Sequence, residues 1–482
     1  MPTYAQVKQR LEAIRQEHLL TFYNTLSSHE QDSLLTQIDA LDLESLPALI
    51  DRYVLSKPGF ELSADLQPAP FIPFDPASPS RPWDRAAAKR AGEDLIRAGK
   101  VAAFTVAGGQ GSRLGFEGPK GCYPAGAVTG KPLFQLFAES LLGVRDRYGR
   151  AVPWYIMTSP LNHASTVAFF EGHRFFGLDA ADVMFFPQGV LPSFDMKTGK
   201  VLLAARNEVA TNPDGHGGSI RALHASGALA DMQRRGVEHI SYFQVDNPIV
   251  RAIDPVFLGL HLQGGGGLRS SAEMSSKMIR KAGPEEKVGV FCAIRGKVEV
   301  IEYSDLPRSL QEQRLEDGTL RFVAGSIAIH VMSVEFVRRL ATDSAFALPY
   351  HRAEKKIPHV DLSTGEVVAP AANNGVKLER FVFDALPLCG ASVVYETDRV
   401  EEFAPIKNAT GVDSVESSRA IQTERAARWL EAAGVKVPRR ADGSADCVLE
   451  VSPRLAGSVN ELLAVKERLP RGVEAGARLA IS

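Results

Sequence analysis

The chain has 482 residues, which is enough for two or three domains of ordinary size. Hydrophobic residues make up 45% and charged residues 23%, and the formal net charge is -2, so the composition is that of a globular protein without a basic field for nucleic acid. No apolar stretch approaches the ~20 residues that cross a bilayer. We therefore expect neither a nucleic-acid partner nor a membrane partner.

The cysteines and the first residues bear on the cellular compartment. The four cysteines (Cys122, Cys292, Cys389 and Cys447) lie far apart and lack the C-x-x-C spacing typical of zinc sites. Residues 1–20 are amphipathic and charged, unlike a secretory signal. A disulfide framework is not indicated, and we expect a cytoplasmic protein.

The first part of the chain is predicted to be helical. Apolar residues recur at helical spacing between residues 3 and 56, as at Val7, Leu11 and Ile14. Six prolines between residues 68 and 82 then predict an extended connector. We expect a helical subdomain and its connector to occupy residues 1–97.

From about residue 100, short apolar runs alternate with helical patterns. Strands are predicted at 101–106, 153–158, 183–187, 239–245, 288–294 and 298–303, and helices at 133–148, 163–172, 220–235 and 255–262. This alternation predicts an α/β domain at 98–390 with a doubly wound, mainly parallel sheet. A helix at 415–434 and a β-rich segment near the end predict a small C-terminal domain at 391–482.

The predicted strand at 101–106 ends in a glycine-rich loop. Gly108, Gly109 and Gly111 follow the strand, and the cations Arg113 and Lys120 come a few residues later. A buried strand that delivers small residues brings backbone N–H groups close to phosphate oxygens, so the loop predicts a nucleotide site. The alternative is a structural turn that binds no ligand.

Two familiar phosphate motifs do not fit this loop. The dinucleotide motif G-x-G-x-x-G needs a third glycine where this chain has Leu114, and it needs a helix that begins inside the glycines. A Walker A loop needs Gly-Lys-Ser/Thr, whereas Lys120 is followed by Gly121. Prolines and glycines up to Gly126 instead predict an open, extended loop.

The loop and a series of later motifs resemble one enzyme family. AGGQGSRLG at 107–115, followed by PKG at 119–121, is similar to the signature of the UDP-sugar pyrophosphorylases, above all their UDP-N-acetylglucosamine branch. Further motifs follow in the family's order: QGVLP at 188–192, NPDGHGG at 212–218, VDN at 245–247, KVGV at 287–290, EYS at 302–304, PYH at 349–351, KKIP at 355–358, KLERFVFD at 377–384 and FAPIKN at 403–408. The resemblance covers roughly residues 83–415 and implies a Rossmann-like nucleotidyltransferase.

The resemblance implies that UTP reacts with a sugar 1-phosphate to give a UDP-sugar and pyrophosphate, with Mg²⁺ as cofactor. N-acetylglucosamine 1-phosphate is the favoured sugar substrate, and glucose 1-phosphate or a broader range of sugars is the alternative. An alternative of another class is a regulatory protein that binds UDP-sugars without turnover. A different nucleotide, ATP or dTTP, is a further alternative that the resemblance disfavours.

The resemblance also implies roles for individual residues. The catalytic cations are Arg113, Lys120, Lys377 and Lys407; Arg113 would contact the departing pyrophosphate and Lys120 the reacting phosphates. Asp246 would hold Mg²⁺. The implied UTP-binding residues are Gly108, Gly109, Gly111, Ser112, Gln188, His216, Gly217 and Gly218, and the implied sugar-binding residues are Asn247, Glu302, Tyr303, Ser326 and Phe383. The alternatives are surface salt bridges for Arg113 and Lys120, solvated surface lysines for Lys377 and Lys407, and a helix cap for Asp246.

Three positions depart from the UDP-N-acetylglucosamine branch. Ser326 and Ile329 replace two asparagines of the family, and His216 replaces a third. The first asparagine is expected to touch the amino sugar, so the shorter hydroxyl of Ser326 weakens the case for N-acetylglucosamine 1-phosphate. The sequence leaves the identity of the sugar open.

Overall fold

The computed structural model describes residues 2–57, 59 and 62–482, and the chain divides into two compact units. The smaller unit comprises Met1–Leu62, Gln188–Ser219 and Leu348–Asp384, and the larger unit comprises Ser63–Pro187, Ile220–Ala347 and Ala385–Ser482. Each unit is thus built from three separate stretches of chain. The division into 1–97, 98–390 and 391–482 stays a prediction.

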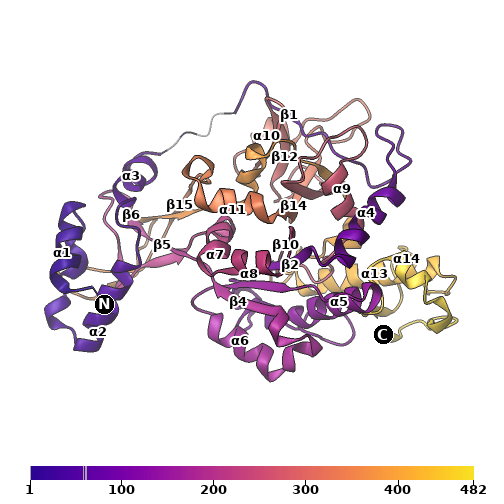
Figure 1. Ribbon diagram of the computed structural model, residues 1–482, viewed down its shortest axis with the longest axis horizontal. Helices are drawn as coiled ribbons and strands as arrows, with labels where there is room; N and C mark the ends of the chain where they lie inside the picture. The colour runs from indigo at the N-terminus through magenta and orange to yellow at the C-terminus, as the bar shows by residue number, and fades with distance from the viewer. Residues whose placement is uncertain (1, 58, 60–61) are drawn as a thin grey trace. The chain divides into compact units, whose positions relative to one another are not determined.

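A ten-stranded sheet forms the centre of the larger unit (Figure 1). In spatial order its strands are β1 (Gln67–Pro68), β12 (Val290–Ile294), β14 (Ala324–Ser333), β10 (His239–Gln244), β2 (Val101–Val106), β3 (Trp154–Thr158) and β4 (Val183–Pro187), with β11 (Met274–Arg280), β13 (Lys297–Ile301) and β19 (Val394–Glu396) paired beside this path. β10, β2, β3 and β4 are mutually parallel, whereas β14 is antiparallel to β10 and β11. The α/β fold class is confirmed, and the six predicted strands are found to within two residues at either end.

Helices flank the sheet. They are α4 (Arg85–Arg97), α5 (Leu133–Tyr148), α6 (His163–Gly172), α7 (Ser219–Ala225), α8 (Ala228–Arg234), α9 (Pro255–Gln263), α10 (Arg308–Gln311) and α11 (Val334–Thr342). The sequence pattern predicts those at α5, α6, α7 with α8, and α9 but not α4, α10 or α11. The single helix predicted at 220–235 is two helices, because Gly227 has a φ of 80° and breaks it. In the core, Phe134 and Phe137 of α5 pack against Trp154 of β3.

The smaller unit joins the N-terminal helices to short strands from later in the chain. Its helices are α1 (Tyr4–Ala13), α2 (Ser28–Asp39) and α3 (Leu46–Leu49), and its strands are β5 (Val190–Pro192), β6 (Phe194–Asp195), β7 (Leu203–Ala205), β8 (Glu208–Val209), β9 (Thr211–Pro213), β15 (His351–Lys355), β16 (His359–Val360), β17 (Val367–Val368) and β18 (Gly375–Glu379). Leu11, Leu34 and Ile38 are buried with Phe194 and Leu378 in one hydrophobic cluster. The predicted helices are confirmed, and their apolar faces pack on these strands.

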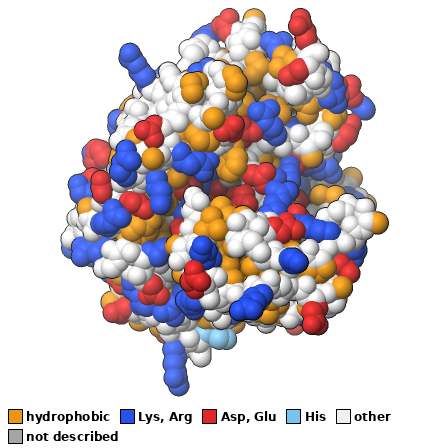
Figure 2. Space-filling model, turned by 90° about the vertical axis from the view of Figure 1, so that its right-hand side faces the viewer, with side chains coloured by type: hydrophobic (Ala, Val, Ile, Leu, Met, Phe, Trp, Pro, Cys, Tyr) orange, Lys and Arg blue, Asp and Glu red, His pale blue; other side chains and the backbone are white. Residues whose placement is uncertain are grey.

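The last part of the chain forms α12 (Arg399–Glu402), α13 (Val415–Ala432), α14 (Val459–Leu463) and the parallel pair β20 (Val448–Val451) and β21 (Arg478–Ile481). Trp429, Leu430, Leu449 and Leu462 share a hydrophobic cluster of their own. None of the helices that the structure describes is long and apolar enough to cross a membrane. Figure 2 shows Lys and Arg side chains interspersed with Asp and Glu on the face drawn, in keeping with the near-zero net charge.

Candidate active site

The glycine-rich loop lies at the C-terminal end of β2 and closes back on itself. The amide of Gly111 donates to the carbonyl of Gly118 at 2.9 Å, and the amide of Lys120 donates to the carbonyl of Gly109 at 3.0 Å. These two bonds bring Lys120 beside the glycines although it lies eleven residues after Gly109 in the sequence. The amides of Gly108, Gly109 and Ser112 donate to no acceptor in the described part of the chain, so they are available to an anion.

Asn162 holds the loop in place, a role that no motif in the sequence indicates. Its side-chain amide donates to the carbonyls of Ala107 and Gly109 at 3.1 and 3.3 Å, while its Oδ1 accepts from the amide of Ser159 at 2.8 Å. The residue is fully buried just before α6. An asparagine before a helix is ordinarily interpreted as a cap, so only the fold reveals that it grips the loop.

The loop has glycine at different positions for different reasons. A side chain at Gly109 would meet no atom within 4 Å, whereas a Cβ at Gly111 would lie 2.7 Å from Phe116 and one at Gly121 would lie 2.1 Å from Phe134. Gly109 therefore borders open space that a ligand can occupy. Gly111 and Gly121 are required by packing within the protein.

Three of the four predicted cations, Arg113, Lys120 and Lys407, lie in the larger unit with Asp246. Asp246 follows β10, and its carbonyl accepts from the amide of Ile406 at 2.8 Å, which places Lys407 next along the chain. Burial lowers the pKa of Lys120; the charge of Asp246 opposes this shift, and those of Lys407 and Arg113 add to it. The charges of Asp246, Lys407 and Arg113 thus all act on Lys120 near the ends of the parallel strands β2 and β10, where ligands bind in such sheets.

This arrangement suits Mg²⁺ only as an ion shared with a substrate. Among the residues the structure describes, no group of three or more His, Cys, Asp or Glu side chains could enclose a metal. Mg²⁺ commonly uses one or two carboxylates, with phosphate oxygens and water filling the other positions. A single carboxylate at Asp246, beside a loop with open amides, fits that donor set.

Six predicted residues lie in the smaller unit: Gln188, His216, Gly217, Gly218, Lys377 and Phe383. Gln188 is 7% exposed, and its side-chain amide has no hydrogen bond to the residues described, so a donor and an acceptor stay available. Lys377 lies half-buried on β18, opposite Ala353 of β15. Both stay predictions as ligand contacts.

His216 is a neutral ring held in an aromatic cluster. The amide of Val382 donates to its Nδ1 at 3.1 Å, which leaves the proton on Nε2. The ring stacks on Phe381 with centroids 5.2 Å apart and lies 5.6 Å from the ring of Phe383. Burial, and then the nearby His351, lowers the pKa of His216 to about 4. The ring can therefore donate one hydrogen bond at neutral pH but carries no charge.

Gly217 and Gly218 make room for the protein's own chain. The amide of Gly217 donates to the carbonyl of Arg380 at 2.8 Å, and a Cβ at Gly217 would lie 2.7 Å from the backbone of Arg380 and Phe381. A Cβ at Gly218 would lie 2.0 Å from the carboxylate of Asp214. These contacts explain both glycines without a ligand, and their contact with UTP stays a prediction.

The residues predicted to bind the sugar differ in accessibility. Tyr303, just after β13, is 39% exposed, whereas Asn247 is 5% exposed. The amide of Ser326 donates to the carbonyl of Gly289 at 2.7 Å, and the register of β14 shifts against β11 just beyond it, where Ala328 has a φ of 53°. Bulges of this kind re-aim side chains near active sites. Ile329, within the bulge, is 3% exposed and belongs to the core.

Comparison with known proteins decides the family. A family model described as UTP–glucose-1-phosphate uridylyltransferase matches residues 82–432. The chain belongs to this family. UDP-N-acetylglucosamine diphosphorylase 2 of Arabidopsis thaliana is 36% identical over 466 residues, which are 92% of this chain and 88% of that protein. UDP-N-acetylhexosamine pyrophosphorylase-like protein 1 of Homo sapiens is 37% identical over 483 residues, which are 95% of this chain and 94% of that protein.

Solved structures agree with this assignment. The uridine diphosphate N-acetylglucosamine pyrophosphorylase of Trypanosoma brucei has a TM-score of 0.81 and 25% identity, and the match covers 98% of this chain and 97% of that chain. The predicted resemblance is confirmed, and the protein is a uridylyltransferase of the UDP-sugar pyrophosphorylase type. UTP, a sugar 1-phosphate, a UDP-sugar and pyrophosphate fit that family as substrates and products.

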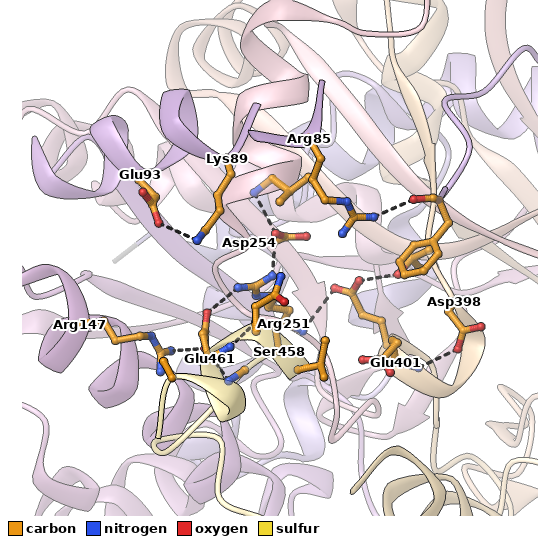
Figure 3. Close-up of a pocket in the computed structure, with 18 of the residues that line it drawn as sticks. Arg85, Lys89, Glu93, Arg147, Arg251, Asp254, Asp398, Glu401, Ser458 and Glu461 are labelled. Carbon is orange, nitrogen blue, oxygen red and sulfur yellow. Dashed lines mark hydrogen bonds and ion pairs between the residues drawn. The ribbon is translucent and has the colours of Figure 1, made fainter. Parts of the chain in front are cut away.

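A cavity of about 690 Å³ lies elsewhere in the larger unit of this uridylyltransferase. Its lining comes mainly from α4, α12 and α14, with single residues or pairs from α5, α9, α13 and β19 and from neighbouring loops. Figure 3 shows Arg251 between Asp254 and Glu461 within it. None of the predicted site residues lines this cavity. Its charged groups largely pair with one another, as Arg251 does with Glu461 at 2.6 Å.

Proposed function

We propose that the enzyme transfers the uridylyl group of UTP to N-acetylglucosamine 1-phosphate, giving UDP-N-acetylglucosamine and pyrophosphate. The observation that carries this proposal is the glycine loop, whose open amides lie beside Lys120 and the charges around Asp246. The choice of sugar is supported by the relatives from Arabidopsis thaliana and Saccharomyces cerevisiae that are named for UDP-N-acetylglucosamine. The compartment we propose is the cytoplasm, which the free thiols of the four cysteines support.

In this mechanism the amides of Gly108, Gly109 and Ser112 bind the triphosphate of UTP. A phosphate oxygen of the sugar substrate attacks the α-phosphorus in line, and the bond to pyrophosphate breaks as the new P–O bond forms. Arg113 neutralises the departing pyrophosphate, while Lys120 and Lys407 offset the charge that builds on the reacting phosphates. The protein supplies position and charge, and no side-chain nucleophile is needed.

Asp246 would hold Mg²⁺ together with phosphate oxygens of UTP. When bound there, the ion would neutralise phosphate charge as the pyrophosphate departs. Asp246 suits this role because its backbone is fixed by Ile406 and its carboxylate lies among cations that attract the same phosphates. Gln188 would read the uracil edge with its free amide, since an amide offers both a donor and an acceptor.

A second candidate keeps the reaction and changes the sugar to glucose 1-phosphate. It is favoured by Ser326, whose hydroxyl is shorter than an amide, and by the burial of Ile329 in the core, where it offers a sugar no polar group. A buried polar group of a substrate that lacks its partner in the site costs ~1–3 kcal/mol of free energy, so a missing partner changes the preference between two sugars by about that amount. The two candidates therefore differ in preference between sugars and share the same chemistry.

The test is pyrophosphate release from UTP and Mg²⁺ with N-acetylglucosamine, N-acetylgalactosamine and glucose 1-phosphates in parallel. The first proposal expects the highest kcat/KM with N-acetylglucosamine 1-phosphate. The highest value with glucose 1-phosphate would instead support the second candidate. Absence of pyrophosphate with every sugar, across a titration of Mg²⁺, would overturn both.

A further inference from the structure

The side chain of Asn247 is occupied by a segment of chain far away in the sequence. Its Nδ2 donates to the carbonyl of Glu402 at 2.7 Å, and its Oδ1 accepts from the amide of Ala404 at 3.1 Å. Asn247 is only 5% exposed. Both ends of its amide are thus used within the protein, and little of its surface is left for a sugar.

The same segment is anchored at neighbouring points. The amide of Ile406 donates to the carbonyl of Asp246 at 2.8 Å, and the hydroxyl of Ser418 donates to the carbonyl of Ala404 at 2.7 Å. At its start, the carboxylate of Glu402 accepts from the buried ammonium of Lys277 at 2.6 Å. Residues 402–406 are therefore fastened along Asp246 and Asn247, and the next residue is Lys407.

We propose that Asn247 is a positioning residue, which fixes the segment 402–406 so that Lys407 lies among Asp246, Lys120 and Arg113. The inference rests on the proposed function in one respect, namely that Lys407 acts on the reacting phosphates. It replaces the predicted role of Asn247 as a sugar contact. Asn247 acts through the backbone of Glu402 and Ala404 and touches no substrate.

Loss of the anchor at Asn247 should slow catalysis, because a cation neutralises the reacting phosphates only when it is placed precisely. A misplacement of about 1 Å at a catalytic group can cost ~10²-fold in rate. When the amide of Asn247 is removed, the amide of Ala404 and the carbonyl of Glu402 lose their buried partners, and the segment can relax toward water. We expect kcat to fall by ~10- to 10²-fold for this reason, with little change in the KM of any substrate.

The two roles for Asn247 leave different kinetic signatures. A positioning residue acts on the reacting phosphates that all sugar 1-phosphates share, so kcat falls by the same factor with each of them. A sugar contact would raise KM selectively for the sugar whose group it touches. A double-mutant cycle with Lys407 adds a second criterion, because residues that act through one another are not additive.

The experiment uses the full chain with Asn247→Ala and Asn247→Asp, each alone and combined with Lys407→Ala. Asn460→Asp is the matched control, since Asn460 is exposed on α14 and makes no side-chain hydrogen bond to the residues described. Kinetics are measured with the three sugar 1-phosphates. Hydrogen–deuterium exchange across 402–408 is measured without substrate, because the amides of Ala404 and Ile406 report the anchoring directly.

The proposal expects a uniform loss of kcat, little further loss when Asn247→Ala is added to Lys407→Ala, and faster exchange across 402–408. A loss confined to KM for one sugar, a fully multiplicative cycle, wild-type kcat for Lys407→Ala, or unchanged exchange would each overturn it. If the wild-type enzyme releases no pyrophosphate with any sugar, the proposed function fails by itself, and the exchange data still decide whether Asn247 anchors the segment.

Ser418→Ala keeps the proposal testable if both Asn247 variants fail to fold. It removes a different anchor of the same segment from α13 and leaves Asn247 unchanged. We expect the same uniform loss of kcat, smaller in size at ~3- to 10-fold, because a single neutral hydrogen bond is lost. Wild-type kcat together with unchanged exchange in Ser418→Ala would overturn the proposal.

Discussion

Lys277 offers the sharpest test of how the larger unit is held together. It is 1% exposed, and its ammonium lies 2.7 Å from Asp254 and 2.6 Å from Glu402. Lys277→Met keeps the length of the side chain and removes the charge that the two carboxylates share. Breaking a buried ion pair by removing one partner costs about 3–5 kcal/mol, because the remaining charges are left uncompensated. We expect a loss of that size in the free energy of unfolding.

The loss should depend on pH with a definite sign. Burial alone would raise the pKa of Asp254, but the charges of Lys277 and Arg251 outweigh burial and hold that pKa well below its usual range. A carboxyl with a depressed pKa stabilises the fold above its unfolded value of ~3.9 and ceases to do so as the pH falls through its folded value. Without Lys277 the pKa of Asp254 rises, so the destabilisation is largest near neutral pH and shrinks as the pH falls toward 4 and below.

Tryptophan fluorescence during urea unfolding is a selective assay for this effect. The chain has three tryptophans, and Trp83, Trp154 and Trp429 all lie in the larger unit. Lys466→Met, at an exposed position of the same unit, is the control and should be neutral. A loss under about 1 kcal/mol for Lys277→Met, far below the range for a broken buried pair, or a loss that grows toward acid pH, would refute the reasoning.

Three further predictions concern the candidate site. Gly109→Ala should keep wild-type stability, because its Cβ meets no protein atom, but should lower kcat, because the Cβ enters the space proposed for the ligand. Gly121→Ala should instead lower the thermal stability, because its Cβ would lie 2.1 Å from Phe134. The rate should fall at alkaline pH, beginning below the ordinary lysine pKa, because burial lowers the pKa of Lys120 and its charge is lost as the pH rises. Lys120→Arg should abolish this alkaline fall in rate. NMR of the imidazole nitrogens should find His216 neutral and protonated on Nε2 down to a pH near its pKa of about 4.

Much of the fold could be predicted because its central strands carry local signals. β2, β3 and β10 are short apolar runs buried on both faces, and β4 is a short apolar run that is half-buried at the end of the strand order. β11 and β14 were not predicted. β11 carries Ser275, Ser276 and Lys277 in its interior, so its apolar pattern is interrupted by buried polar groups whose partners lie far away in sequence.

The candidate site was predictable where the chemistry of a residue is used locally, and it was hidden where a distant segment supplies the partner. The loop from Gly108 to Lys120 has glycines and cations within one stretch of sequence, so the pattern alone predicts a phosphate site, and the structure adds the open amides. Asn162 donates hydrogen bonds to the same loop although it lies 55 residues after Ala107 and 53 residues after Gly109. Nothing within its own neighbourhood separates that role from an ordinary helix cap.

Gln188 and Asn247 show that a match to a family motif does not by itself determine what a side chain contacts. Both are amides in family motifs next to strands, and both were predicted to contact a substrate. The amide of Gln188 has no hydrogen-bond partner in the described part of the chain, whereas that of Asn247 is consumed by Glu402 and Ala404, 155 and 157 residues away. The same side-chain amide is thus left available to a ligand at Gln188 and is bonded to the backbone at Asn247. Because Asn247 is 5% exposed and both its Nδ2 and its Oδ1 are bonded to residues 402 and 404, we expect selection among sugars to depend on other side chains, and Ser326 beside the β14 bulge is the first to change.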